Sequence, residues 1–579
     1  MIRIATMLVL AALLRLYGIN WDQGFHLHPD ERQLIFVADK IHFFDNLNPD
    51  FFNYGTLPIY ILKGVSQLCD ILFGTHLANY TGMLYVGRIL STSVDLLTIY
   101  LVYKIALLIF KKERLALFSS FFYAVSFFTI QNSHFFIVDT FLTFFITALF
   151  YLLLTYVKKP ELKKVFWMSL TFAAAVTTKI TAIIFLPLIV MLFIIDSVKR
   201  HSGSSRIRFL ASLGMTGGGF ALFSFIFSFI FMPYAYLDYQ KFLTDVLLQI
   251  KLNSDPYIFP YTLQYVYTLP YLHYLKNIFL WGLGPIIGSL AIIGLLTVIL
   301  NLFQDLNQIP KQVRNDQSTM KQFNNVTMAF FLFFFLFYFL IIGRSAVKFM
   351  RYMLPIYPFL AILAGVGLMK LAEIVRIKRV SVGLILICCL LWTFAFLSIY
   401  SQKHTRIAAS EWINQNIPSG STLAIEHWDD RLPLFGQEKY NFVELTLYDQ
   451  PDDENKWQIM NQKLKTSDYI VLASNRLYVP LQKLSDCTKY KLCYPKTAQY
   501  YQNLFAGENV LLGSEATPGS ADSGRARMTS TVRFQKTAEF TVNPMFSLLG
   551  FTFQIDDQSA DESFTVYDHP KVIIFKKLR

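Results

Sequence analysis

Charged residues are scarce in this chain of 579 residues, because Asp, Glu, Lys and Arg together make up only 16% of it. Soluble domains carry about 25% charged residues, so this deficit excludes an ordinary soluble globular protein. The chain is instead 54% hydrophobic and 16% aromatic, with a mean hydropathy of +0.42. Many apolar stretches reach the roughly 20 residues that a helix needs to cross a bilayer. These properties predict a polytopic membrane protein.

Cysteine is also scarce, and the five cysteines show no zinc-type spacing. Cys388 and Cys389 lie within an apolar stretch, where we expect them to be packing residues. Cys487 and Cys493 lie close together in the polar C-terminal part, where two alternatives stay open: a disulfide if this part is exported, or two free thiols. The sequence has neither a Walker loop nor a Rossmann glycine pattern, which argues against a cytoplasmic nucleotide site.

The net charge of +13 does not indicate a nucleic-acid-binding protein. Basic residues cluster in short loops between apolar segments, which is typical of cytoplasmic loops of membrane proteins. The charge therefore reports topology, and we expect no nucleic-acid partner.

Eleven apolar segments are predicted to span the membrane as helices. No small-residue cleavage site follows the first of them, so we expect an uncleaved span with a cytoplasmic N-terminus. The predicted spans are 3–20, 83–109, 115–131, 137–157, 165–178, 180–197, 210–232, 277–301, 327–343, 354–374 and 382–400.

Alternation of these spans places five loops in the cytoplasm, and every one of them is basic, as the positive-inside rule requires. The same alternation places the C-terminus outside the cytoplasm. The basic residues are Lys111, Lys112 and Arg114; Lys158, Lys159, Lys163 and Lys164; Lys199, Arg200, Arg206 and Arg208; Lys311, Arg314 and Lys321; and Lys370, Arg376, Lys378 and Arg379.

Three outer segments are long enough to carry function. The first, 21–82, contains an apolar stretch at 57–73 that is predicted to form an interfacial helix. The second, 233–276, is rich in tyrosine, which favours an interfacial belt; stacking on sugar or lipid is the alternative. Its tyrosines are Tyr234, Tyr236, Tyr239, Tyr257, Tyr261, Tyr265, Tyr267, Tyr271 and Tyr274.

The third outer segment, 401–579, is polar, and we expect a small α/β domain that follows a membrane domain at 1–400. Residues 410–417 resemble a short helix that ends at Pro418-Ser419-Gly420. Strands are predicted at 421–426, 468–473, 529–534 and 570–575. Two motifs in this segment, 426–430 and 567–570, are either catalytic or acceptor-binding groups, or turns and strand ends at a surface.

Carboxylates near spans are costly and tend to mark function. Asp30 and Glu31 follow the first span, where one can act as a general base while the other orients it or binds a cation; a solvated loop in which Asp30 caps a helix is the alternative. Asp139 lies at the outer end of the fourth span. We expect it to line a substrate cavity together with Asp30; the alternative is an acidic residue at a helix N-terminus that is stabilised by the helix dipole.

Several cations lie on the outer side, against the usual bias. Arg344, Lys348 and Arg351 share one short loop between the ninth and tenth spans. Such a loop is suited to a phosphate at the lipid boundary. Arg88 and Lys179 are further phosphate candidates, although each is also consistent with a cation that snorkels to the interface. Asp95, two helical turns from Arg88, is a candidate buried partner for it.

Taken together, these stretches resemble the GT-C superfamily of membrane glycosyltransferases, near the protein O-mannosyltransferases and the lipid A aminoarabinose transferases. The resemblance is carried by the order of several short motifs along about residues 1–400. They are His28-Pro29-Asp30-Glu31, Asn53-Tyr54-Gly55-Thr56-Leu57-Pro58, Gly87-Arg88-Ile89-Leu90-Ser91, Ser133-His134 with Asp139-Thr140, Thr178-Lys179, and Arg351-Tyr352-Met353-Leu354-Pro355.

The resemblance implies a polyprenyl-phosphate monosaccharide as donor and transfer by a single inverting displacement. Asp30 would be the catalytic acid with Glu31 beside it, Arg88 would contact the lipid phosphate, and Asp139 would line the cavity. Some relatives bind a divalent cation near the catalytic acid, so a cation on His28 and His134, with His26 nearby, is left open. The chain departs from the mannosyltransferases at 233–276, which is too short for their β-trefoil domain.

The sequence therefore predicts a multi-pass enzyme of the cell membrane whose active site and tail lie on the extracytoplasmic side. Its partners would be the lipid bilayer, a polyprenyl-phosphate-linked sugar, and an acceptor that is a protein, a lipid or an envelope glycan. Two other classes are weighed against it. A transporter or lipid flippase should show internal repeats and broken helices, and an assembly protein leaves the outer cations unexplained.

Overall fold

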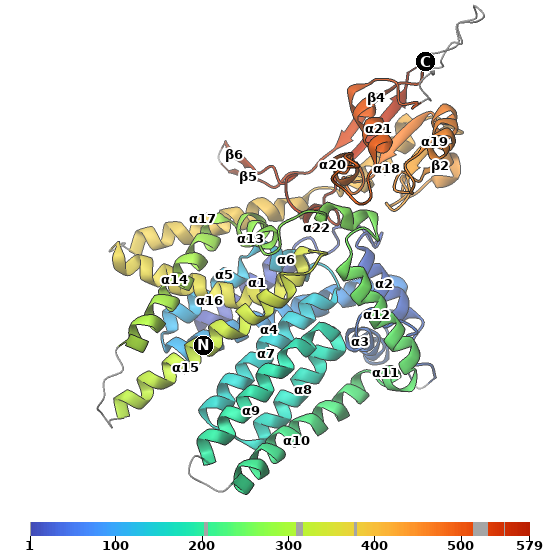
Figure 1. The fold of residues 1–579 in the computed structure, drawn as a ribbon. Coiled ribbons are helices and arrows are strands. Elements are labelled where there is room, and N and C mark those ends of the chain that lie inside the picture. Colours follow the sequence, from blue (N-terminus) through green and yellow to red (C-terminus); the bar gives the residue numbers. More distant parts are fainter. Residues whose placement is uncertain are drawn as a thin grey trace, which may run out of the picture. The chain divides into compact units, whose positions relative to one another are not determined.

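The computed structural model of the chain describes residues 2–43, 45–201, 206–307, 316–375, 379–512, 531–548 and 550–578. It divides into two compact units (Figure 1). Unit 1 comprises Met1–Asn20, His26–Asn253 and Leu269–Leu397, and unit 2 comprises Trp21–Phe25, Ser254–Thr268 and Ser398–Arg579. Two short pieces of the outer segments thus belong to the same unit as the tail.

Unit 1 is built from helices. They are α1 (Ile2–Leu16), α2 (Pro29–Asp39), α3 (Leu57–Phe73), α4 (Tyr80–Phe110), α5 (Glu113–Ala124), α6 (Phe127–Ser133), α7 (Val138–Lys158), α8 (Leu162–Thr178), η1 (Ile180–Phe185), α9 (Leu186–His201), α10 (Arg206–Phe231), α11 (Tyr234–Leu237), α12 (Tyr239–Ser254), α13 (Leu272–Asn277), η3 (Ile278–Gly282), α14 (Pro285–Asn307), α15 (Asp316–Ile342), η4 (Met350–Ile356), α16 (Tyr357–Ile374) and α17 (Arg379–Leu397).

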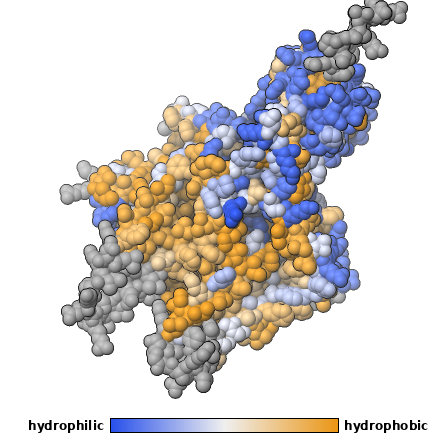
Figure 2. Space-filling view, viewed as in Figure 1, coloured by the Kyte–Doolittle hydropathy of each residue, from blue (hydrophilic) through white to orange (hydrophobic). Residues whose placement is uncertain are grey.

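Helices lie at all the predicted span positions, and seven of those described are long and apolar enough to cross a membrane. The count is up to eight if α5 and α6, which meet at a 58° bend, form one span. The predicted spans 3–20, 165–178 and 327–343 correspond to shorter helical segments, so the total of eleven stays a prediction. Apolar side chains dominate the face of unit 1 seen in Figure 2, as expected of a multi-pass membrane protein.

Two glycines explain how closely the helices of unit 1 pack. A Cβ atom at Gly294 of α14 would lie 1.8 Å from the carbonyl oxygen of Leu363. A Cβ atom at Gly367 of α16 would lie 1.9 Å from the carbonyl oxygen of Leu290. Small residues allow the backbones of two membrane helices to approach in this way, and α14 and α16 are accordingly in close contact.

The bend between α5 and α6 is stabilised by a buried ion pair. Arg15 donates to the carbonyl oxygen of Ala124, which the bend leaves without its helical partner, and to Asp95 at 2.5 Å. Tyr123 also donates to Asp95. Asp95 therefore pairs with Arg15, and the suggestion that it is the partner of Arg88 is wrong. Polar side chains of the protein fill this break, as they do at structural kinks.

The structure describes only some of the basic residues that are predicted to face the cytoplasm. Lys311, Arg314, Arg376 and Lys378 lie outside the described residues, as do the side chains of Lys199, Arg200, Arg206, Arg208, Lys321 and Arg379. By contrast, the helix predicted at 57–73 is confirmed as α3, whose Ile71, Leu72 and Phe73 are exposed, and its interfacial position stays a prediction.

Unit 2 is an α/β structure. Its elements are η2 (Pro260–Tyr265), η5 (Ser398–Ser401), α18 (Thr405–Asn416), β1 (Thr422–Glu426), η6 (Gln437–Lys439), β2 (Asn441–Leu445), α19 (Glu454–Thr466), β3 (Tyr469–Leu472), α20 (Tyr478–Lys483), α21 (Pro495–Ala506), β4 (Phe534–Phe540), β5 (Met545–Leu548), β6 (Phe551–Gln554), α22 (Glu562–Thr565) and β7 (Val572–Lys577). The five-stranded sheet has the order β2-β1-β3-β7-β4, and β5 pairs with β6.

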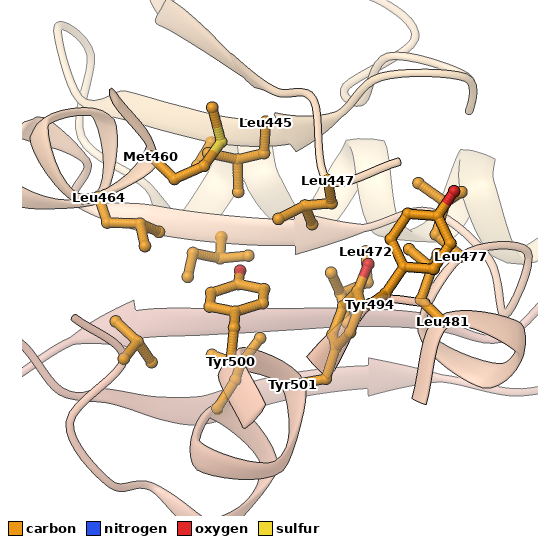
Figure 3. Packing of buried hydrophobic residues seen from close by; sticks show 14 of the residues in the cluster. Leu445, Leu447, Met460, Leu464, Leu472, Leu477, Leu481, Tyr494, Tyr500 and Tyr501 are labelled. Atoms are coloured by element: carbon orange, nitrogen blue, oxygen red, sulfur yellow. The ribbon is translucent and has the colours of Figure 1, made fainter. Parts of the chain in front are cut away.

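Strands β1, β2 and β3 are parallel, and β7 runs antiparallel to both β3 and β4. One face of the sheet buries a core with α19, α20 and α21 (Figure 3). The other buries a core with α18. Side chains alternate between the two, as the pleat requires: Ala424 faces the first core, and Leu423 and Ile425 face the second.

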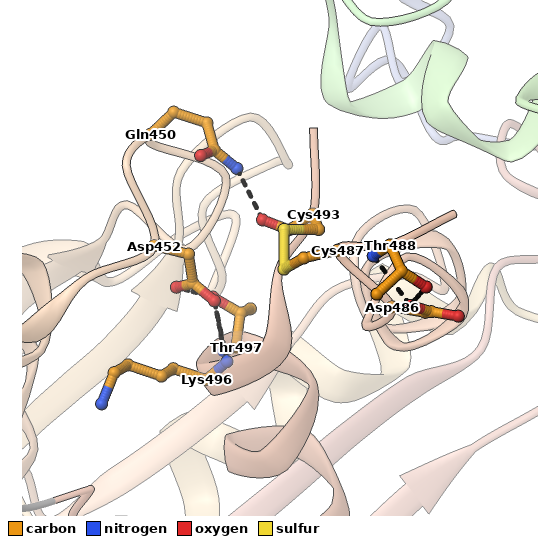
Figure 4. Close-up of a disulfide and its surroundings, with 8 residues drawn as sticks. All are labelled: Gln450, Asp452, Asp486, Cys487, Thr488, Cys493, Lys496 and Thr497. Atoms are coloured by element: carbon orange, nitrogen blue, oxygen red, sulfur yellow. Dashed lines mark hydrogen bonds between the residues drawn. A yellow bond between two sulfur atoms is a disulfide. The ribbon is translucent and has the colours of Figure 1, made fainter. Parts of the chain in front are cut away.

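Three of the predicted strands correspond to β1, β3 and β7, whereas the one at 529–534 overlaps β4 only at Phe534. Its first residues, 529 and 530, lie outside the described residues. The helix predicted at 410–417 begins earlier, at Thr405. Cys487 and Cys493 form a disulfide (Figure 4), which decides between the two alternatives for these cysteines.

Candidate active site

The first turn of α2 presents Asp30, and the sequence before it explains why the helix begins there. His28 is the N-cap, and its ring nitrogen Nδ1 accepts a hydrogen bond from the Glu31 amide at 3.4 Å. Pro29 follows at the first helical position, where its missing N–H costs nothing. Acidic residues in a first turn are stabilised by the helix dipole. Asp30 is thus fixed at a helix terminus.

Four of the predicted site residues meet in one group, which we call the charge cluster: Asp30, Asp139, Lys179 and Arg351. Arg351 lies 2.7 Å from Asp30 and 3.8 Å from Asp139. Lys179 donates to Asp139 at 2.7 Å. The Asp30 side chain is 21% exposed and the Asp139 side chain only 3%. Asp139 is therefore the buried carboxylate that contacts both cations, and Asp30 is the carboxylate more accessible to a ligand.

Each member of the charge cluster comes from the end of a helical segment. Asp139 lies in the first turn of α7, Lys179 caps α8, and Arg351 lies in η4 just before α16. Residues at helix ends can keep charged groups near water while the helices themselves stay apolar. This location explains how two acids and two bases gather in a membrane domain.

Aromatic rings lie against the cations of the charge cluster. Lys179 Nζ lies 4.4 Å from the Tyr352 ring centroid, and the Arg351 guanidinium lies 4.8 Å from that of Phe349. Tyr352 is held in turn by a 3.0 Å hydrogen bond from its hydroxyl to Asn253. Cation–π contacts of this kind orient a cation without neutralising it. The rings thus help to orient both cations, whose charges are balanced by Asp139 and Asp30.

Tyr54 is a further neighbour of the charge cluster. Burial, and then the Asp30 carboxylate, raise the pKa of Tyr54 well above its ordinary value. The phenol therefore stays protonated and can donate a hydrogen bond. Gly55 explains its position, because a Cβ there would lie 1.8 Å from the Thr177 carbonyl oxygen. Only glycine lets this loop approach the end of α8, where the Gly55 amide donates to Thr178.

Glu31 and Arg88 lie apart from the charge cluster in a pair of their own. Arg88 donates to both carboxylate oxygens of Glu31, at 3.0 and 2.7 Å, and neither side chain is exposed. The Phe136 amide also donates to Glu31, and Arg88 donates to the Ile19 carbonyl. The adjacent carboxylates of the motif thus point to different partners.

The two histidines considered as metal ligands are buried and bonded to the backbone or to rings. His134 has Ile130 and Tyr17 carbonyl oxygens 2.8 Å from its two ring nitrogens. His28 caps α2 and packs against Phe135. Among the described residues, no three His, Cys, Asp or Glu side chains come together to hold a metal ion. The donor set around His28 and His134 therefore does not fit a metal site.

The remaining outer cations have different surroundings. Arg344 is exposed, and Lys348 is buried with its ammonium 3.0 Å from the Ala346 carbonyl oxygen. Arg351, from the same loop, contacts Asp30.

Both motifs in the tail contain buried charged groups, although His427 and Trp428 of the first motif are exposed. Asp429 and Asp430 both pair with the buried Arg406. His569 lies between Asp568 and Asp557, and although burial lowers its pKa, these carboxylates raise it to about 10. Both motifs thus contribute buried polar networks to unit 2.

Sequence reasoning did not assign roles to Tyr54, Phe349, Tyr352 or Asn253. Tyr54 and Tyr352 lie within the motifs that carry the resemblance, and their place in these motifs is the signal that could have found them. Asn253 has no such signal, because its contact with Tyr352 spans 99 positions of sequence.

Residues 73–229 match the family model for dolichyl-phosphate-mannose-protein mannosyltransferases. This match covers Arg88, Asp139 and Lys179, and it confirms the resemblance to GT-C membrane glycosyltransferases for this part of the chain. No curated protein matches the sequence significantly.

Three solved structures are similar to the chain at low identity. The Archaeoglobus fulgidus oligosaccharyltransferase, in complex with Zn and sulfate, has a TM-score of 0.47 and 12% identity, covering 86% of this chain and 71% of that one. ArnT from Cupriavidus metallidurans bound to undecaprenyl phosphate gives 0.46 and 12%, covering 83% and 94%. The Saccharomyces cerevisiae Pmt1-Pmt2 O-mannosyltransferase complex bound to the sugar donor gives 0.32 and 19%, covering 42% and 34%.

Proposed function

We propose that the chain transfers a monosaccharide from a polyprenyl-phosphate donor to a hydroxyl acceptor on the extracytoplasmic face of the membrane. The observation that carries this proposal is the charge cluster, in which the partly exposed Asp30 carboxylate pairs with Arg351, and the buried Asp139 contacts both Arg351 and Lys179. A base for the acceptor and a clamp for a phosphate leaving group are the two parts that such a transfer needs. The family match at 73–229 supports the same reaction class.

In this mechanism Asp30 takes the proton of the acceptor hydroxyl. The acceptor oxygen attacks the anomeric carbon as the bond from that carbon to the phosphate oxygen breaks. Polyprenyl phosphate leaves with the bonding electrons, and Arg351 and Lys179 stabilise its charge. A single displacement of this kind inverts the anomeric centre.

The contacts of Arg351 suggest how donor binding prepares the base. Its guanidinium lies 2.7 Å from the Asp30 carboxylate. A donor phosphate competes for this guanidinium, because phosphate accepts paired hydrogen bonds as a carboxylate does. Transfer of Arg351 to the phosphate frees the Asp30 carboxylate for the acceptor. Asp139 keeps Lys179 in place during this exchange, and protonated Tyr54 is a donor to the bound sugar.

Glu31 and Arg88 act as positioning residues in this proposal. Their buried pair joins the first turn of α2 to α4, and the Phe136 amide ties the same carboxylate to the segment before α7. Asp30 lies in α2, and Asp139 lies in the first turn of α7. The pair therefore fixes the distance between the acids of the charge cluster, whereas the resemblance had implied that Arg88 contacts the lipid phosphate.

The test is a transfer assay on the purified full-length protein with radiolabelled polyprenyl-phosphate sugars and a cell-envelope extract. Asp30→Asn is compared with Asp50→Asn, which alters an acid in the same outer segment whose side chain is 78% exposed. We expect label to move with wild type and Asp50→Asn and not with Asp30→Asn. The labelled product then identifies the acceptor class. Sugar transfer that Asp30→Asn leaves intact would remove Asp30 from this role, and lipid or solute flux without transfer would favour a transporter.

A further inference from the structure

The sheet of unit 2 contains a point where the chain reverses its direction of winding. Strand β1 is parallel to β2 on one side and to β3 on the other. The connection from β1 to β2 contributes Leu432 and Tyr440 to the core on the α18 face, whereas α19, between β2 and β3, packs on the opposite face. In open α/β sheets, ligands bind outside the carboxyl ends of the strands at such a switch point. Here that point lies between β1 and β3.

Trp428 lies at this edge, two residues beyond the end of β1. Its backbone φ is +79°, in the left-handed region, and its side chain is 41% exposed. Holding a non-glycine residue in this region costs of order 1–3 kcal/mol, and such strain clusters at functional sites. Because the indole stays 41% exposed, burial returns less free energy than it does for a core tryptophan. A large, partly exposed aromatic side chain at a strained position therefore points to a role in binding.

A second energetic cost lies close to the first. Glu426, the last residue of β1, is only 4% exposed, and its Oε2 atom has no hydrogen-bond partner among the described residues. Its other oxygen accepts from Tyr501. Unsatisfied buried polar atoms are few in native proteins and call for a reason. Strain and unused hydrogen-bonding capacity thus occur within three residues at the carboxyl end of β1.

The neighbours of Trp428 extend its aromatic surface. The ring of Phe259 meets Trp428 edge-on at 5.7 Å and stacks on Tyr261 at 5.1 Å. Both residues come from the tyrosine-rich outer segment, which was predicted to form an interfacial belt. Tyr265 and Tyr267 of the same segment also hydrogen-bond within unit 2, to Asp561 and Lys489. This part of the segment is therefore built into unit 2.

A polar group lies on another side of Trp428. The His427 ring lies 5.3 Å from the Trp428 ring. Glu444 accepts from Arg431 at 3.1 Å and has His427 Nδ1 at 3.3 Å. These three side chains are 44–46% exposed. They present an imidazole, a carboxylate and a guanidinium beside an aromatic plane.

We propose that Trp428 is the centre of a carbohydrate-binding site, formed with Phe259, His427, Arg431 and Glu444, that takes a hexose-containing glycan. A sugar ring has an apolar face, which matches an exposed indole, and a rim of hydroxyls, which matches paired donors and acceptors. A lipid surface would favour an apolar surround in place of exposed charges of both signs. That this glycan is the acceptor rests on the proposed function.

The test measures binding of neutral tetrasaccharides (mannotetraose, chitotetraose, cellotetraose and galactotetraose) to the full-length protein in nanodiscs by surface plasmon resonance. Trp428→Gly is the decisive variant, because glycine adopts a positive φ without strain. The protein should then unfold at the same or a higher temperature while binding of the recognised tetrasaccharide weakens at least about tenfold. Ile459→Ala is the matched control, since Ile459 is 54% exposed in the same unit; it should bind as wild type does.

Binding that Trp428→Gly leaves unchanged, or binding of none of the four sugars, would overturn the proposal. Unchanged sugar binding together with lost binding of a serine-rich peptide in Trp428→Gly would also overturn it, in favour of a peptide-binding surface. Asp30→Asn should bind the tetrasaccharide as wild type does. This readout therefore keeps its meaning even if sugar transfer itself is not found.

Discussion

Glu31 and Arg88 form a bidentate ion pair in which neither side chain is exposed. The pair joins α2 to α4 across 57 positions of sequence. Asp30, which precedes Glu31 in the sequence, pairs instead with Arg351. Two adjacent acids thus have separate tasks: one fixes the helix, and the other faces the charge cluster.

Breaking this pair should destabilise the protein whether or not donor is present. Glu31→Gln leaves the Arg88 guanidinium buried without its counter-charge, and the loss of one partner of a buried pair costs about 3–5 kcal/mol. Arg88→Lys should also be costly, because an ammonium cannot reproduce the two parallel bonds. Thermal unfolding in detergent without donor measures both effects. An unchanged unfolding temperature for Arg88→Lys with a raised KM for donor would instead return Arg88 to a phosphate-binding role.

Substitutions at the two cations of the charge cluster should act on the donor. Lys179→Ala and Arg351→Lys each remove a charge-assisted hydrogen bond of about 1.5–3 kcal/mol, so KM for the polyprenyl-phosphate sugar should rise by about tenfold or more. Lys241→Ala is the control, since Lys241 pairs with acids only at 3.6 Å near the surface. Steady-state kinetics with varied donor gives the comparison. A KM unaffected by both changes would contradict the phosphate clamp.

The disulfide predicts on which side of the membrane the tail lies. Disulfides persist in oxidising compartments outside the cytoplasm, so Cys487 and Cys493 should be accessible from outside in intact cells. In a chain with Cys69, Cys388 and Cys389 changed to serine, a membrane-impermeant maleimide should label only after mild reduction. Labelling that requires permeabilised cells would place the tail on the cytoplasmic side.

The stability of unit 2 should fall as pH rises from about 6.5 to 9. Asp568 and Asp557 outweigh burial and raise the pKa of His569 to about 10, and burial raises that of Glu426 to about 8. Ordinary values are about 6.5 and 4.3, so the folded state holds both protons more tightly. The contribution of His569 is full below about pH 6.5 and is lost as pH rises through about 10; that of Glu426 is lost between about 4.3 and 8.

Hydrogen exchange at β1 and β3 in the full chain measures this dependence. His569→Gln should flatten the alkaline part of the profile, and Glu426→Gln the part near neutral pH. Protection that is constant, or that increases with pH, would show that neither proton is held as the geometry implies.

Local pattern was enough to predict the apolar helices of unit 1, because each apolar stretch specifies a helix by its own length and composition. The helix α12, in the tyrosine-rich segment, was not predicted. Asp30, Asp139, Lys179 and Arg351 were among the residues expected around one substrate, but nothing in the sequence indicated that Glu31 and Arg88 form a separate pair. Asn253, Phe349 and the role of Tyr54 did not follow, since these contacts depend on how loops fold back on the helices.

The partners of buried charges were not readable from sequence. Asp95 is seven residues from Arg88 and lies on the same helix, yet it pairs with Arg15, 80 positions away. Pairing of this kind depends on which helices become neighbours, and hydrophobic periodicity carries no such information. For the same reason, nothing in the segments 21–25 and 254–268 indicated that they belong to unit 2.

The central claim is that Asp30 is the base of a sugar transfer, and a single-turnover measurement at saturating donor tests it most directly. The enzyme is loaded with radiolabelled donor, mixed with acceptor, and the transfer rate constant is compared among wild type, Asp50→Asn and Asp30→Asn. We predict that Asp30→Asn lowers this rate constant by about 10²–10⁴-fold. Its unfolding temperature should stay near that of wild type, and it should bind donor at least as tightly, because Arg351 no longer pairs with a carboxylate at position 30. A rate constant for Asp30→Asn equal to that of Asp50→Asn would contradict the account.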